Sequence, residues 1–132
     1  MVEYCLDTSI IIEIFRGNRE LSEKIDNLKL LGNLFYLTPI TLCELFKGAF
    51  LHVNSNTKID QINKFISYFE ILSFDIDSCK EYGYLYYKNR NLGKMIPDFD
   101  LMIASITKSK EVVFVTKDKK HFNNLGIKLE EW

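Results

Sequence analysis

Short apolar runs alternate along the chain with longer segments in which apolar residues recur every three or four positions. Runs rich in β-branched and aromatic residues predict strands at 2–7, 35–38, 71–76, 112–116 and 127–132. Helical spacing predicts helices over 8–17, 19–31, 40–53, 58–70, 78–91 and 101–110. Thr8 is the predicted N-cap of the first helix, and Pro39 suits the first turn of the third. Strands that alternate with helices predict a parallel sheet between two helical layers.

Length, charge and cysteine content limit the classes of protein to which this chain could belong. A chain of 132 residues with 47% hydrophobic content is expected to form one domain over 1–132. Eighteen acidic against seventeen basic residues exclude the protein-wide basic field of many nucleic-acid binders, so any contact with a polyanion must be local. Three cysteines, scattered through apolar segments, predict reduced core thiols and a cytoplasmic location. We expect neither a signal peptide nor a membrane span.

Four acidic residues fall where one edge of such a sheet is expected. Asp7 ends the first predicted strand, and Asp118 follows the strand at 112–116. Asp100 lies in the first turn of the helix that leads into that strand, and Glu44 lies about one turn into the helix after 35–38. Because open parallel sheets place their working crevice beyond the carboxyl ends of the strands, we expect these four side chains to converge.

Each acid also has a purely structural interpretation. Asp7 can cap the first helix, Asp98 and Asp100 can interact with a helix dipole, and Asp118 can be a turn residue. Glu44 resists such an explanation, because it lies among apolar neighbours and a buried, unpaired glutamate is rare.

Electrostatics implies a cation among converging carboxylates. Two carboxylates about 6 Å apart repel by roughly 3 kcal/mol at an effective dielectric near 20. Ligands that are all oxygens select Mg²⁺ or Mn²⁺ over zinc, and His52 and His121 are too far separated to complete a zinc site with the cysteines. An ion held in this way suits hydrolysis of phosphodiester bonds.

Four segments, taken in order, resemble the four sequence blocks of PIN-domain ribonucleases. They are Leu6–Phe15, Ile40–Ala49, Ile96–Ser105 and Val113–Phe122. Small members of this length are most often VapC-type toxins of toxin-antitoxin pairs. The resemblance implies a three-layer α/β/α sandwich around a mostly parallel sheet of four to five strands. It also implies Mg²⁺- or Mn²⁺-dependent cleavage of RNA, a homodimer, and an antitoxin whose C-terminal segment enters the acidic groove.

The resemblance also implies roles for individual residues. The metal-binding and catalytic acids are expected to be Asp7, Glu44, Asp100 and Asp118. Asp100 is preferred to Asp98 because "DLMIA" fits the third block, which leaves Asp98 as an accessory acid. Supporting residues that orient the carboxylates and water are expected to be Thr8, Ser9 and Thr116.

Cations that flank the four blocks are candidates for RNA binding at the rim of the acidic site. They are Arg16, Lys47, Lys88, Arg90, Lys94, Lys117 and Lys119. Two rival functions stay open. One is a catalytically silent PIN module that only binds RNA or protein. The other is a receiver-like phosphoacceptor domain, which would need paired acids after the first strand, where Asp7 is instead followed by Thr8.

Overall fold

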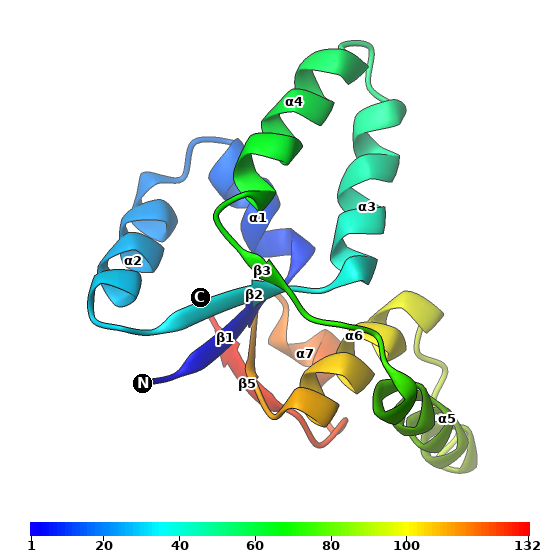
Figure 1. Cartoon of the computed structure of the whole chain (residues 1–132). Coiled ribbons are helices and arrows are strands. Elements are labelled where there is room, and N and C mark those ends of the chain that lie inside the picture. The colour runs from blue at the N-terminus through cyan, green and yellow to red at the C-terminus, as the bar shows by residue number, and fades with distance from the viewer.

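The computed structural model describes residues 1–132 and contains a single five-stranded sheet with the order β3-β2-β1-β4-β5 (Figure 1). Every neighbouring pair of strands is parallel. The strands are β1 (Glu3–Leu6), β2 (Leu34–Leu37), β3 (Glu70–Ile71), β4 (Val113–Thr116) and β5 (Lys128–Glu131). This confirms the predicted α/β class, with a sheet that is wholly rather than mostly parallel.

Seven helices connect the strands and cover both faces of the sheet (Figure 1). They are α1 (Thr8–Phe15), α2 (Arg19–Leu30), α3 (Pro39–Phe50), α4 (Ser55–Ile66), α5 (Ile76–Asn91), α6 (Asp98–Lys110) and α7 (Lys119–Phe122). No helix combines the length and the apolar character that crossing a membrane requires.

Two hydrophobic clusters fill the space between the sheet and its helical layers. On one face, Tyr4 and Leu6 of β1 pack with Val115 and with residues of α1 to α4. On the other face, Cys5 and Phe114 pack with residues of α5, α6 and α7. Neighbouring residues of one strand thus enter opposite clusters, as the two-residue period of a strand requires. The result is the predicted three-layer α/β/α sandwich.

The register of the central strands fixes the edge where the candidate site lies. Leu6 of β1 pairs with Val115 of β4, and the amide of Asp7 donates a hydrogen bond of 2.8 Å to the carbonyl of Val115. Asp7 and Thr116, the next residues along each chain segment, therefore meet at the carboxyl edge of the sheet.

Several element boundaries differ from the sequence prediction: α4, for example, spans Ser55–Ile66 rather than 58–70, and α7 has no predicted counterpart. Asp7, not Thr8, is the N-cap of α1. The strand predicted at 71–76 is reduced to Glu70–Ile71, because the carboxylate of Asp75 accepts a hydrogen bond from the amide of Ser78 and starts α5 at once. Helix α6 begins at Asp98, three residues before the predicted start.

The prediction of three core thiols is correct only for Cys5. Cys43 and Cys79 are exposed, although all three thiols are free. Helix α3 buries Leu45 and Ala49, and α5 buries Leu85 in place of Cys79. Both exposed cysteines therefore lie outside the buried stripe of an otherwise apolar segment.

Candidate active site

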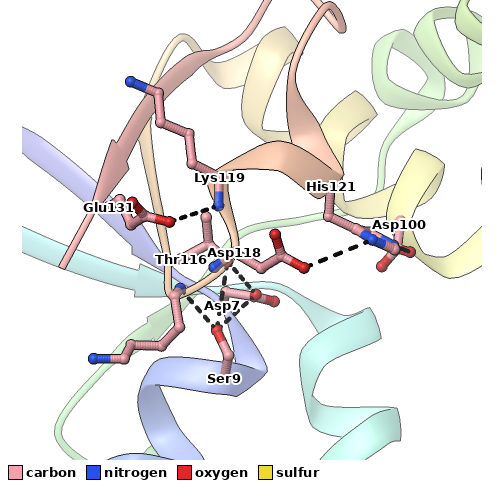
Figure 2. A network of polar contacts seen from close by, with 9 residues as sticks. Asp7, Ser9, Asp100, Thr116, Asp118, Lys119, His121 and Glu131 are labelled. Atoms are coloured by element: carbon pink, nitrogen blue, oxygen red, sulfur yellow. Dashed lines mark hydrogen bonds and ion pairs between the residues drawn. The ribbon is translucent and has the colours of Figure 1, made fainter.

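Asp7 is held at the carboxyl edge of the sheet by three hydrogen-bond donors. Its Oδ1 accepts from the amide of Thr8 at 2.8 Å, which caps α1. Its Oδ2 accepts from Ser9 Oγ at 2.9 Å and from Thr116 Oγ1 at 2.7 Å (Figure 2). Both oxygens are thus oriented by neutral groups, and the predicted orienting role of Ser9 and Thr116 has a direct contact to support it.

Glu44 meets α1 through a single hydroxyl. Thr8 Oγ1 donates to Glu44 Oε1 at 2.7 Å, which links residues 36 positions apart. Glu44 and Thr8 line a hollow of about 380 Å³ between α1, α3 and α4, together with Arg16 and His52. Thr8, the residue after Asp7, therefore connects the start of α1 to the second turn of α3, which carries Glu44.

Burial and mutual repulsion raise the pKa of two of these carboxylates. Burial raises the pKa of Asp7, hydrogen bonds from Thr116, Ser9 and Thr8 lower it in part, and the charge of Asp100 raises it again. Burial also raises the pKa of Glu44, the Thr8 bond opposes the shift, and the charges of Asp7 and Asp100 add to it. Asp100 is therefore close enough to Asp7 and Glu44 for its charge to disfavour their ionised forms.

Asp100 and Asp118 are brought together by a residue that sequence reasoning did not select. His121 Nε2 lies 2.6 Å from Asp100 Oδ2, and His121 Nδ1 lies 3.9 Å from Asp118 Oδ2 (Figure 2). The amide of Asp118 donates to Thr116 Oγ1 at 3.1 Å, which ties the turn after β4 to the Asp7 network. The spacing of Asp118 and His121 could have indicated that the two side chains lie close together, because residues three apart share one side of a helical turn.

Asp98 lies beside α5 and makes different contacts from Asp100. Tyr82 donates its hydroxyl to Asp98 Oδ1 at 2.7 Å. Asp98 also lines a hollow of about 480 Å³, together with Asn89, Arg90 and Lys94. The two acids of the pair, which differ little in sequence context, thus have separate partners: a tyrosine for Asp98 and a histidine for Asp100.

The predicted RNA-binding cations are all exposed, and three of them line hollows that also contain Glu44 or Asp98. They are Arg16, Lys47, Lys88, Arg90, Lys94, Lys117 and Lys119. Arg16 lines the hollow that contains Glu44, whereas Arg90 and Lys94 line the one that contains Asp98. Lys47 is near enough to Glu44 to lower its pKa slightly against the stronger raising effects. The cations thus flank the acids from at least two sides.

The carboxylate oxygens of the four candidate acids are the type of ligand that a hard divalent cation prefers. None of the four candidate carboxylates forms an ion pair with a lysine or an arginine; those ion pairs join Arg16 to Glu13, Lys108 to Glu81 and Lys110 to Asp75. The negative charge of the cluster is therefore not neutralised by a permanent cation of the chain. No group of three or more His, Cys, Asp or Glu side chains is arranged as a ready metal site. Asp7, Glu44 and Asp100 each turn an oxygen to a hydrogen-bond partner of their own.

Comparison with known proteins agrees with this geometry. The PIN domain family model matches residues 4–128. Ribonuclease VapC3 of Methanocaldococcus jannaschii is 38% identical over 101 residues, which cover 76% of this chain and 94% of the relative. The tRNA(fMet)-specific endonuclease VapC of Salmonella typhimurium is 27% identical over 133 residues, which cover 100% of this chain and 99% of the relative.

A solved structure gives the same result for the fold. In the crystal structure of DNA-bound VapBC from Salmonella typhimurium, one chain superposes with a TM-score of 0.90 at 28% identity, covering 100% of this chain and 99% of that one. The family model spans nearly the whole chain, and the archaeal relative is similar over most of its own length. The chain therefore belongs to the PIN-domain family, among the VapC-type ribonucleases.

Proposed function

We propose that residues 1–132 form a single nuclease domain that hydrolyses RNA phosphodiester bonds internally, with a divalent metal ion, as the toxin of a toxin-antitoxin pair. The observation that carries the proposal is the acidic cluster. Asp7, Glu44 and Asp100 come from three distant segments, and none of them has a lysine or arginine partner. The charge of Asp100 raises the pKa of both Asp7 and Glu44. Family membership sets aside the receiver-like alternative.

Asp7, Glu44, Asp100 and Asp118 would hold Mg²⁺ or Mn²⁺, because a set of carboxylate oxygens favours these ions. When bound, such an ion lowers the pKa of a water molecule and neutralises charge on the scissile phosphate. The protein's own contribution is to hold the carboxylates in position. Ser9 and Thr116 fix Asp7, and Thr8 fixes Glu44.

The RNA would approach an acidic site on a protein whose net charge is −1. We propose that the exposed rim cations named above contact the phosphates on either side of the scissile bond. Each phosphate contact of this kind makes binding weaker as salt concentration rises. Tyr82 holds Asp98 beside Arg90 and Lys94, which supports an accessory role for Asp98 near this rim.

Similarity to a VapBC complex supports a protein partner for this chain, which we propose to be an antitoxin. A homodimer and a cytoplasmic location follow from the same family resemblance and are proposed with it.

Cleavage of labelled RNA tests the proposal. The probes are an initiator transfer RNA, suggested by the name of the Salmonella typhimurium relative, and a single-stranded RNA oligonucleotide. We expect cleavage with Mg²⁺ or Mn²⁺ and none after EDTA. Binding of RNA without cleavage, unaffected by metal, would instead support the silent PIN module.

The two acids of the third block provide a matched pair of variants. Asp100→Asn should lower the single-turnover cleavage rate by at least about 100-fold, as loss of a ligand does. Asp98→Asn should stay within about threefold of the unmodified protein, because Asn keeps an oxygen that can accept from Tyr82. Full cleavage by Asp100→Asn would show that the wrong acid was chosen.

A further inference from the structure

His121 makes the closest contact of any side chain with Asp100. Its Nε2 lies 2.6 Å from Asp100 Oδ2, and the two atoms form a hydrogen bond between the side chains. The imidazole is 45% exposed, whereas the Asp100 side chain is 19% exposed. The contact therefore joins a half-exposed imidazole to a carboxylate that is mostly buried.

The core determines where His121 sits. Its ring packs edge-on against Phe122, with 5.6 Å between ring centroids. Phe122 is buried and packs in turn against Phe114 of β4, at 4.8 Å. Helix α7 is only one turn long, but this aromatic contact anchors it to the central sheet. The imidazole is thus presented to α6 by a fixed support rather than by a free loop.

Asp100 differs from Asp7 and Glu44 in the kind of side chain that forms a hydrogen bond with it. Asp7 receives hydroxyl hydrogen bonds from Ser9 and Thr116, and Glu44 receives one from Thr8. No hydroxyl contacts Asp100, so the imidazole occupies the place that serine and threonine take for the other two. Hydrogen-bond donors to a metal-binding carboxylate set its orientation, and their loss typically costs 10- to 100-fold in metal affinity or activity.

We propose that His121 is a positioning residue of this active site: its Nε2–H holds Asp100 Oδ2, leaves Oδ1 for the divalent ion, and ties α6 to the turn that carries Asp118. The role requires only the tautomer with its proton on Nε2, and no charge on the ring. It rests on the proposed metal-dependent function. It assigns to His121 an outer contact to a ligand, not a bond to the ion.

Three variants separate orientation from packing. His121→Phe keeps an aromatic ring against Phe122 but has no N–H to donate. His121→Gln keeps a donor at similar reach. Tyr68→Phe is the control, because Tyr68 is 74% exposed and lines neither the hollow that contains Glu44 nor the one that contains Asp98.

Mn²⁺ binding to the RNA-free protein, followed by the electron paramagnetic resonance signal of free Mn²⁺, is the main measurement. We expect His121→Phe to bind Mn²⁺ 10- to 100-fold more weakly. His121→Gln and Tyr68→Phe should stay within about threefold of the unmodified protein. Melting temperatures measured in EDTA should agree among all four proteins, because the imidazole is half exposed. Rescue by Gln distinguishes positioning from a general structural role.

Two results would overturn the inference while leaving the proposed function intact. One is Mn²⁺ binding by His121→Phe equal to that of the unmodified protein. The other is a strong ¹⁴N coupling to bound Mn²⁺ in the unmodified protein that disappears in His121→Gln, which would make His121 a direct ligand. Failure of the unmodified protein to bind Mn²⁺ or to cleave RNA would overturn the proposed function and this inference together.

Discussion

Glu44→Gln should stabilise the metal-free protein at neutral pH, although it removes a proposed metal ligand. Gln keeps an oxygen that can accept the hydrogen bond of 2.7 Å from Thr8. It removes a charge whose pKa is raised by burial and then by the charges of Asp7 and Asp100. A carboxyl whose pKa is raised in the folded state stabilises that state at low pH, and the stabilisation is lost as pH rises through the raised value.

The size of the effect follows from the surroundings of Glu44. Two carboxylates about 6 to 8 Å apart repel by roughly 0.5 to 3 kcal/mol for effective dielectrics between about 80 and 20. Glu44 is only partly buried and Lys47 attracts it, so the lower part of this range applies. We expect a net gain of about 1 kcal/mol. For a chain of 132 residues, this corresponds to a rise of about 4 °C in melting temperature.

Thermal unfolding in EDTA at pH 7.5 and at pH 4 measures this gain. The difference between the two proteins should shrink at pH 4, because protonation of the unmodified Glu44 removes the same charge. Glu23→Gln, at an exposed position of α2, is the control and should leave the melting temperature unchanged within about 1 °C. In excess Mn²⁺ the unmodified protein should have the higher melting temperature, because it keeps the Glu44 carboxylate and is stabilised more by the bound ion. Lower stability of Glu44→Gln in EDTA at pH 7.5, or a gap that does not depend on pH, would refute the reasoning.

Two further predictions concern stability alone. Thr116→Val should cost about 1 to 3 kcal/mol in urea unfolding, because the Asp7 carboxylate and the Asp118 amide both lose their bond to a fully buried hydroxyl; unchanged stability would show that water replaces it. Asp75→Asn should destabilise the protein at neutral pH through loss of the Lys110 ion pair, which holds the pKa of Asp75 down at about 2. That contribution is present above the ordinary pKa of an aspartate and is lost as pH falls towards 2, so melting curves of the two proteins should converge there.

The meeting of Asp7 and Thr116 at one edge of the sheet could be predicted in part, because it depends on topology. A parallel sheet sends every strand's carboxyl end to the same edge. Asp7, which follows β1, and Thr116, the last residue of β4, therefore meet because the two strands are neighbours. The strand at 112–116 was easy to identify, since an unbroken β-branched run has few alternatives. Pattern and topology together thus specify the positions of these residues, without any knowledge of side-chain contacts.

The inward face of α5 could not be predicted from apolar periodicity. The spacing of apolar residues in 78–91 predicts that Cys79, Tyr82, Leu85 and Tyr86 face inward. Leu85 is buried, but Cys79 and Tyr86 are exposed. The buried stripe instead includes Ser78 and Asn89. Asn89 donates to the carbonyl of Leu85 at 2.8 Å, so its own helix satisfies part of its polar requirement. A polar side chain that forms a hydrogen bond within its own helix can be buried at little cost in free energy. A prediction based on hydrophobicity alone places such a residue on the exposed face.

The donors that orient the candidate acids are neutral, and this explains how the site can be both ordered and strongly negative. Hydroxyls on Thr8, Ser9 and Thr116 fix the carboxylates without cancelling their charge. A lysine or arginine in the same places would orient them equally well but would neutralise the cluster and compete with a divalent ion. The uncompensated negative charge instead contributes to the raised pKa values of Asp7 and Glu44 in the folded protein. Orientation and charge are therefore supplied by different residues. Variants of Glu44 should therefore change both the pH dependence of stability and metal affinity, whereas variants of His121 should change metal affinity and leave stability in EDTA unaltered.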